Sequence, residues 1–536
     1  MKALLNRYLG IVILVWAGAW ALAAATLPLL PIDETRYLTV AWEMRLQHSW
    51  ILPTLNFAPY SHKPPLLFWL INLVWSVTGG PAVWSARIVP FLVSTGVLCG
   101  TFAFARRLFP DRENMPVVAV LVLAASPFFY IYGNMLMFDM LNSLIALCAA
   151  VCVWQAAQSG KCRWLLLWGV AVGFGVLAKG PVILIYTVFP VLFAPLWKKP
   201  GSRAKWYGAF VAGILVAAAI GLSWAVPAAL FGGPAYAEMI FWKQSAGRMV
   251  KAFDHERSAL FYVPFLLAMF LPLVLWSAWW RALRVQVRSI AACEAGRFLL
   301  CVVIPPLVCL LLISGKQGHY LVPIMPGAAI FFAAVLEKKL RDLSAPCMPF
   351  AVLGVFLLAA LAAPVIAPDL AFVQKDQFMH TIIESINPYV TLAALAVTAI
   401  LYMASRRVEG AGRLLCLSLS IAAFFAHFQT QAAQRTFEYY DLTPIAAEIQ
   451  AHKERPVAFV RNYEGELGFM ARLETPLMSL ASLGELRGWF VKNPDGIAIV
   501  RFKDDSELSG YRVLFRMPYR CATKFIALVE MEDGKQ

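Results

Sequence analysis

The sequence predicts a polytopic α-helical membrane protein that carries a small C-terminal α/β domain. Of its 536 residues, 60% are hydrophobic and only 14% are charged, and the mean hydropathy is +0.68. This composition excludes an ordinary soluble globular protein of the same size. Long uncharged stretches recur along the chain, and regular charge begins only at about residue 430.

Thirteen apolar segments are candidates to cross a bilayer, and they set the predicted architecture of about 13 transmembrane helices. They lie at approximately 8–30, 82–105, 115–132, 138–158, 163–179, 181–197, 206–228, 258–280, 297–314, 320–337, 347–366, 387–405 and 411–429. The segment 65–79 is also apolar, but a helix of this length reaches only about 22 Å, so it is expected to lie in the outer interface. Gly180-Pro181 predicts a tight turn between two of the spans.

The distribution of basic residues predicts the orientation. Lys and Arg are roughly twice as frequent in the alternate loops that begin with the N-terminus as in the other loops. The N-terminus is therefore expected in the cytoplasm, with the first apolar segment retained as an anchor. Because the number of spans is odd, the C-terminal domain is expected outside. The net charge of +15 follows this loop pattern and does not indicate nucleic-acid binding.

Two domains are expected. Residues 1–430 form the membrane domain, whose first outer loop, 31–81, carries interfacial helices, and residues 431–536 form the soluble α/β domain. In the second domain, alternating apolar runs at 456–462, 496–502, 511–517 and 524–531 predict strands. Amphipathic stretches at 443–453 and 482–493 predict helices between them.

Asp33 and Glu34, directly after the first span, are the candidate catalytic residues. A carboxylate beside apolar surface gains basicity and can act as a general base, although Asp33 is also a good cap for a helix that begins near Glu34. Lys63 follows on the same outer loop, and Pro64-Pro65 stiffens the chain beside it. A fixed ammonium suits a phosphate leaving group, whereas a snorkelling lysine is the alternative. The pattern indicates group transfer involving a phosphate at the membrane surface.

Further polar residues lie at the outer ends of later spans. Asp139 lies at the start of the fourth span, where it either lines a cavity or is a first-turn carboxylate stabilised by the helix dipole. Lys179 and Arg248 are outer-boundary cations that either anchor the surface or contribute to an anion pocket. The short loop 314–326 carries Lys316, His319 and Tyr320 between glycines and prolines, which suits phosphate binding.

These segments resemble the GT-C superfamily of membrane glycosyltransferases, in particular its ArnT-like (aminoarabinose–lipid A transferase) and protein O-mannosyltransferase-like members. The motifs that carry the resemblance are DETRY at 33–37, SHKPPL at 61–66, LMFDM at 136–140, LAKGP at 177–181 and SGKQGHYLVPIMP at 314–326. Each motif is weak alone, and their order and spacing together are specific. The resemblance covers the membrane region and implies the GT-C fold.

The resemblance also implies roles for single residues. Asp33 corresponds to the acidic residue that activates the acceptor or orients the transfer, and Lys63 and Arg36 correspond to groups that hold a lipid phosphate. The other residues that would line the same cavity are Tyr60, Asp139, Lys179, Arg248 and Tyr320. ArnT-like members carry an acidic residue before the Lys of KPP, where this chain has His62. This change leaves dependence on a divalent metal open, with His62 as the candidate ligand, and makes a neutral sugar an alternative to aminoarabinose.

The implied activity is that of an inverting glycosyltransferase. It would move a sugar from a polyprenyl (undecaprenyl) phosphate to lipid A or another envelope glycolipid at the periplasmic face of the bacterial inner membrane. A protein acceptor is the first alternative, and a transporter or flippase of lipid-linked sugars is the second. The charges cluster at one face, without the internal repeats typical of transporters, which favours the enzyme. The expected partners are the donor lipid, the acceptor and the bilayer, with no nucleic acid and no second copy of the chain.

Overall fold

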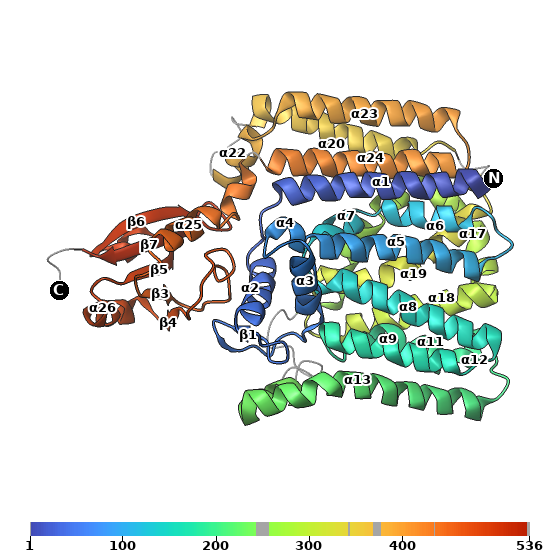
Figure 1. The fold of residues 1–536 in the computed structure, drawn as a ribbon. Helices are drawn as coiled ribbons and strands as arrows, with labels where there is room; N and C mark the ends of the chain where they lie inside the picture. Colours follow the sequence, from blue (N-terminus) through green and yellow to red (C-terminus); the bar gives the residue numbers. More distant parts are fainter. Residues whose placement is uncertain (1, 243–256, 341–343, 368–376, 434, 533–536) are drawn as a thin grey trace.

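The protein consists of a bundle of long helices, two shorter helices across one end of the bundle, and a mixed sheet beyond them (Figure 1). The computed structural model describes residues 2–242, 257–340, 344–367, 377–433 and 435–532. Over these ranges the order of helices and strands agrees with the predicted fold class.

Every predicted span coincides with a helix or with a chain of short helices. In order they are α1 (Lys2–Thr26); α4 (Val83–Ala86) with α5 (Ile88–Leu108); α6 (Met115–Ala124) with α7 (Pro127–Asn134); α8 (Phe138–Ser159); α9 (Arg163–Lys179); α10 (Ile183–Thr187), α11 (Phe189–Leu192) and α12 (Ala194–Trp197); α13 (Arg203–Glu238); α15 (Tyr262–Met269) with α16 (Leu271–Val274); α18 (Glu294–Leu312); the 3₁₀ segment η3 (Gly318–Ile324) with α19 (Met325–Glu337); α20 (Cys347–Ile366); α23 (Pro388–Arg407); and α24 (Ala411–Ala432). Two further helices, α17 (Ser277–Ala292) and α22 (Gln377–Glu384), lie between spans.

Length and apolarity support membrane crossing for most of these helices. Within the described ranges, nine helices are long and apolar enough to span a bilayer, or ten if α6 and α7, which are bent by 70°, form one span. The remaining predicted spans are α9, which has 17 residues, and the two that are divided into short helices. Pro190, Pro195 and Pro272 lie at the starts of α11, α12 and α16, because proline cannot continue the hydrogen bonding of a preceding helical turn.

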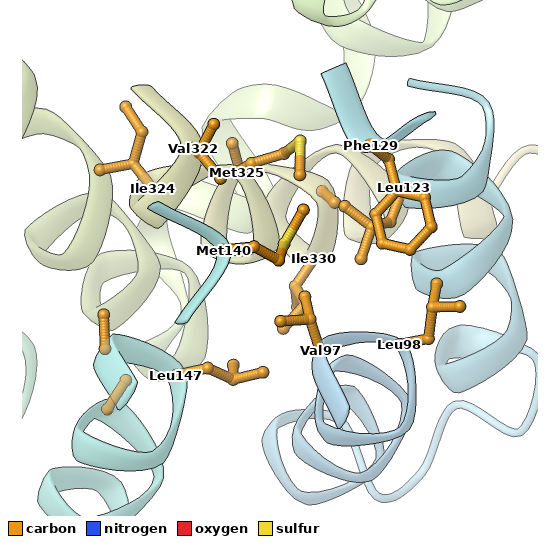
Figure 2. Close-up of a cluster of buried hydrophobic side chains, with 14 of the residues drawn as sticks. Val97, Leu98, Leu123, Phe129, Met140, Leu147, Val322, Ile324, Met325 and Ile330 are labelled. Carbon is orange, nitrogen blue, oxygen red and sulfur yellow. The ribbon is translucent and has the colours of Figure 1, made fainter. Parts of the chain in front are cut away.

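The bundle is apolar both inside and out. Side chains from α5, α6, α8 and α19 pack together in its centre, among them Leu98, Leu123, Met140 and Ile330 (Figure 2). On the perimeter, large apolar side chains such as Leu215 and Val355 are 64% exposed. An apolar surface of this extent is expected of helices that face lipid.

The helices α2 (Asp33–Leu46) and α3 (Leu66–Val77) follow the first span and lie across one end of the bundle (Figure 1). Between them, β1 (Thr54–Leu55) and β2 (Ala58–Pro59) form a small antiparallel hairpin. With 12 residues, α3 is too short to cross a membrane, as expected, and its place in the outer interface stays a prediction.

The C-terminal region contains a five-stranded sheet in the order β4-β3-β5-β7-β6. Its strands are β3 (Val457–Val460), β4 (Met478–Leu480), β5 (Ile497–Phe502), β6 (Tyr511–Pro518) and β7 (Phe525–Met531). Strands β4, β3 and β5 are parallel, and the other two pairings are antiparallel. The helices α25 (Thr443–Ala451) and α26 (Leu483–Lys492) pack in two separate apolar clusters, so they cover opposite faces of the sheet.

A segment of this C-terminal region packs directly on α2 and α3. Phe469 is buried in the core of the membrane region and stacks on Trp75, with ring centroids 5.3 Å apart. The guanidinium of Arg472 lies 4.0 Å from the ring centroid of Phe469. The Nη2 of Arg472 also donates a hydrogen bond to the carbonyl of Pro81. Asn56 exchanges two hydrogen bonds of 2.8 Å with the backbone of Leu477. The sheet is therefore fixed to the segment 31–81 rather than tethered by a linker.

Candidate active site

The first helical turn of α2 presents Asp33 at the end of the bundle. Asp33 is the first residue of the helix and is exposed, and its side chain makes no capping hydrogen bond, so the expected capping role is not observed. The hydroxyl of Tyr37, one turn later, donates to Asp33 Oδ1 at 3.3 Å. Burial, followed by the nearby charge of Asp33, raises the pKa of Tyr37 well above its usual range. Tyr37 therefore stays protonated and orients the Asp33 carboxylate.

Glu34 points away from Asp33 into the protein. It forms an ion pair with Arg87, 3.3 Å between Arg87 Nη1 and Glu34 Oε1, and both side chains are almost fully buried. Its oxygens also accept hydrogen bonds from the backbone N–H groups of Leu30 (2.9 Å) and Leu136 (2.8 Å). These contacts hold together the end of the first span, α2, α5 and the start of α8. Glu34 therefore has a structural role.

Asp139, Lys179 and His319 meet from three different elements, and the Asp33 charge acts on His319. Asp139 is only 2% exposed, and Lys179 Nζ lies 2.5 Å from its Oδ1. His319 Nε2 lies 3.9 Å from the other oxygen. The start of α8, the end of α9 and the segment η3 thus bring together residues that are up to 180 residues apart.

Lys63 belongs to the same cluster. Its ammonium lies 5.8 Å from the ring centroid of Phe138, and its charge acts on both Asp139 and His319. Lys179 in turn lies 5.0 Å from the ring centroid of Tyr320. Lys63 and Lys179 thus bring two ammonium groups to the neighbourhood of the Asp139 carboxylate. Aromatic faces hold both ammonium groups in place.

Arg36 and Tyr60 lie on a cleft between the segment 31–81 and the region of the C-terminal sheet. The cleft has a volume of about 210 Å³, and its lining includes Arg36, Tyr60, His62, Met239, Asn462 and Glu464. The rings of Tyr60 and His62 are 5.2 Å apart. Arg36 Nη2 lies 2.5 Å from Glu464 Oε2, so its charge is already neutralised.

The remaining predicted residues have other surroundings. Lys316 is buried and donates to the backbone carbonyls of Arg257 and Ile313, which fixes the loop before η3. The carbonyl of Tyr320 accepts a hydrogen bond of 2.9 Å from the hydroxyl of Tyr186. Arg248 lies outside the described residues.

No metal site is evident in the described part of the chain, where no group of three or more His, Cys, Asp and Glu side chains is arranged to hold an ion. The Asp139 carboxylate is engaged by Lys179 and His319, and His62 is exposed on the cleft. We derive no step through a metal.

Sequence reasoning missed Arg87, Asn462 and Glu464. Arg87 lies inside the predicted span 82–105, where a charged residue is itself a signal, and it is fully buried against Glu34. Asn462 and Glu464 follow strand β3 more than four hundred residues after α2. Glu464 follows the carboxyl end of the parallel strand β3, which is a common place for a functional side chain. This signal becomes visible only once the direction of the strand is known.

The helical bundle, with the polar cluster at one of its ends, has the GT-C fold. A crystal structure of ArnT from Cupriavidus metallidurans bound to undecaprenyl phosphate superposes on 98% of this chain and 98% of its own, with a TM-score of 0.76 at 18% identity. The apo form of the same protein gives a TM-score of 0.74. Residues 62–224 match the family described as dolichyl-phosphate-mannose-protein mannosyltransferase.

Curated relatives extend the similarity to sequence. An undecaprenyl phosphate-alpha-4-amino-4-deoxy-L-arabinose arabinosyl transferase of Pseudomonas fluorescens is 31% identical over 58% of this chain and 54% of its own length. The corresponding transferase of Erwinia tasmaniensis is 28% identical over 56% and 54%. The chain thus spans about half the length of the curated relatives it matches. These findings confirm the resemblance to ArnT-like and protein O-mannosyltransferase-like members of the GT-C superfamily and the predicted GT-C fold.

Proposed function

We propose that the protein is an inverting glycosyltransferase that moves a sugar from undecaprenyl phosphate to an envelope glycolipid, with lipid A as the first candidate. The observation that carries the proposal is the convergence of Asp33 with the Lys63, Asp139, Lys179 and His319 cluster at the end of an ArnT-like bundle. The printed names of the curated relatives support an undecaprenyl phosphate donor. The protein would lie in the bacterial inner membrane, with a cytoplasmic N-terminus and a periplasmic C-terminal domain.

The cation cluster suits the departing phosphate. As the bond between the anomeric carbon and the phosphate oxygen breaks, its electron pair passes to the phosphate, and Lys63 and Lys179 would stabilise the growing negative charge. Asp139 and His319 would position Lys179 from its other side. Arg36, expected from the sequence to share this task, is neutralised by Glu464, and we assign it to the cleft instead.

Asp33 would act on the acceptor. Its exposed carboxylate would take the proton of the acceptor hydroxyl while the hydroxyl oxygen forms the new bond to the anomeric carbon from the face opposite the phosphate. A single displacement of this kind inverts the anomeric centre. Glu34 was expected to share the catalytic work, but with both oxygens engaged by buried donors it fits a structural role.

A protein acceptor is the second candidate, and the match of residues 62–224 to the mannosyltransferase family favours it. Mass spectrometry of lipid A and of total envelope glycoproteins, from cells with and without the gene, tests both. A lost mass on lipid A supports the first candidate, and a lost glycan on envelope proteins supports the second. If neither lipid A, other envelope glycolipids nor proteins change, the glycosyltransferase proposal fails.

A further inference from the structure

The helix α17 lies between two predicted spans and is amphipathic. It is found at the end of the bundle that carries the N-terminus, away from the end that carries α2 and α3 (Figure 1). Its buried side chains are Ala278, Trp279, Ala282 and Ile290. The ring of Trp279 packs edge-on against the ring of Phe332 in α19, with centroids 4.8 Å apart. One side of α17 is therefore fixed to the bundle.

Three arginines form a row on the other side of α17. Arg281, Arg284 and Arg288 are spaced i, i+3 and i+7, so they project from the helix in similar directions, opposite to the buried residues. All three are exposed. Arg281 donates to Ser344 Oγ at 3.1 Å, whereas Arg284 and Arg288 form no hydrogen bond or ion pair within the part of the chain that the structure describes. Two guanidinium groups are therefore available to a ligand outside the protein.

The surroundings of this row are positively charged. The sequence contains no Asp or Glu between residues 257 and 293. Lys338, which follows α19, is exposed beside α17 and donates to Ser289 Oγ at 3.2 Å. The carboxylates of the helices that pack on α17 are Glu294 of α18, which already forms an ion pair, and Glu337 of α19, which is partly buried. The complementary partner is therefore an anion supplied from outside the protein.

Apolar side chains flank the arginine row. At about 100° per residue, Trp280 and Val285 project on opposite sides of it. Trp280 is 45% exposed and Val285 is 63% exposed. Tryptophan is enriched where a membrane meets water, because its ring is apolar and its N–H is polar. Cations between exposed apolar side chains are typical of a helix that lies in the headgroup region, and they suit a lipid better than a soluble acidic protein.

The short connections of α17 hold it where the spans leave the bilayer. Two residues separate it from α16, and one residue separates it from α18. The helix α18 is long and apolar enough to cross a membrane, and α16 ends a predicted span. A helix joined so closely to both neighbours cannot move away from the bilayer surface.

We propose that α17 and Lys338 bind the headgroup of an anionic phospholipid in the leaflet at this end of the bundle. Arg284 and Arg288 would hold the phosphate, because a guanidinium offers two parallel N–H donors to phosphate oxygens. Trp280 and Val285 would contact the glycerol and the first methylene groups of the acyl chains. The site is independent of glycosyl transfer, and the proposed orientation makes this leaflet the cytoplasmic one.

Titration of the detergent-purified full-length protein with phosphatidylglycerol, followed by native mass spectrometry, tests the inference. Phosphatidylcholine is the comparison lipid, because its phosphate is neutralised within its own headgroup. We expect the wild type to bind phosphatidylglycerol at least about tenfold more tightly. The double variant Arg284→Gln/Arg288→Gln should weaken phosphatidylglycerol binding by about twentyfold, since each cation near an anionic lipid surface contributes about fivefold in affinity. Its phosphatidylcholine binding should stay within about twofold of that of the wild type.

The matched control is Lys161→Gln/Arg163→Gln, which removes two exposed cations from the connection between α8 and α9 at the same end of the bundle. It should leave the affinity for phosphatidylglycerol within about twofold, because the arginine row of α17 is intact. The control distinguishes a defined site from the general attraction of basic loops to anionic lipid. Since all four exchanged side chains are exposed, both double variants should fold like the wild type.

Three results would overturn the inference: equal affinity of the wild type for the two lipids, phosphatidylglycerol binding by Arg284→Gln/Arg288→Gln within about twofold of the wild type, or equal weakening in the control variant. Displacement of the bound lipid by an equal concentration of inorganic phosphate would assign the arginine row to a soluble anion, which would also contradict the proposal.

Discussion

Replacing Glu34 by glutamine is expected to destabilise the protein severely. The Glu34 and Arg87 side chains are 3% and 1% exposed, so the substitution leaves the Arg87 charge buried without its counter-ion. Glutamine also offers one carbonyl oxygen where the carboxylate offers two, so the N–H of Leu30 or of Leu136 loses its acceptor. An unsatisfied buried donor costs about 1–3 kcal/mol, and breaking a buried ion pair costs about 3–5 kcal/mol in all.

Unfolding in detergent, followed by tryptophan fluorescence over a denaturant series, measures this loss. The double variant Glu34→Leu/Arg87→Met should be less destabilised than the sum of its single variants, because both buried charges are removed together. The matched variant Asp33→Asn should unfold like the wild type, since Asp33 is exposed at the helix start. If Glu34→Gln unfolded like the wild type while transfer activity disappeared, the structural role of Glu34 would be refuted and a catalytic role restored.

Three further predictions concern the cation cluster, the docking of the sheet and the pH dependence of stability. Lys63→Gln should weaken undecaprenyl phosphate binding by about tenfold or more, the loss of one charge-assisted hydrogen bond, whereas the exposed control Lys524→Gln should bind like the wild type; equal affinities would remove Lys63 from the donor site. Phe469→Ala, which empties the stacking position on Trp75, should lower the free energy of unfolding by about 3–5 kcal/mol and expose the C-terminal region to proteolysis, while Val491→Ala, 73% exposed, should do neither. Burial raises the pKa of Glu43 above its ordinary 4.5 despite hydrogen bonds from the backbone N–H groups of Phe57 and Asn56, so the folded state holds this proton more tightly than the unfolded chain. The stability that the protonated Glu43 adds is present below pH 4.5 and is lost as pH rises through the folded pKa. A Glu43→Gln variant with an unchanged slope of stability against pH would contradict this assignment.

The helical architecture could be predicted because hydropathy acts locally. Each apolar segment must satisfy its own backbone in lipid, so it forms a helix wherever it lies in the chain. The four predicted strands of the C-terminal region became β3, β5, β6 and β7 for a similar reason, since a short run with apolar residues on one or both faces of a strand is also a local pattern. Strand β4 was missed because its three residues, Met478–Leu480, are too few to show a period.

The site was only partly predictable, because its contacts are not local. Asp33, Lys63, Asp139, Lys179 and His319 could be proposed from polarity at the ends of spans, and the structure brings them together. Glu34 and Asp33 are adjacent in sequence, and only their burial distinguishes them. The partner of Glu34 lies 53 residues away and the partner of Arg36 lies 428 residues away, separations at which no periodic pattern carries information.

The most direct test of the central claim is the transfer of aminoarabinose from undecaprenyl phosphate to lipid A by the purified full-length protein in nanodiscs, with Asp33→Asn beside the wild type. We predict that the wild type forms the glycosylated lipid and that Asp33→Asn lowers the rate by at least about a hundredfold, as expected on loss of a general base. Undecaprenyl phosphate binding and stability should both be retained. An Asp33→Asn protein that transfers at the wild-type rate would contradict the account.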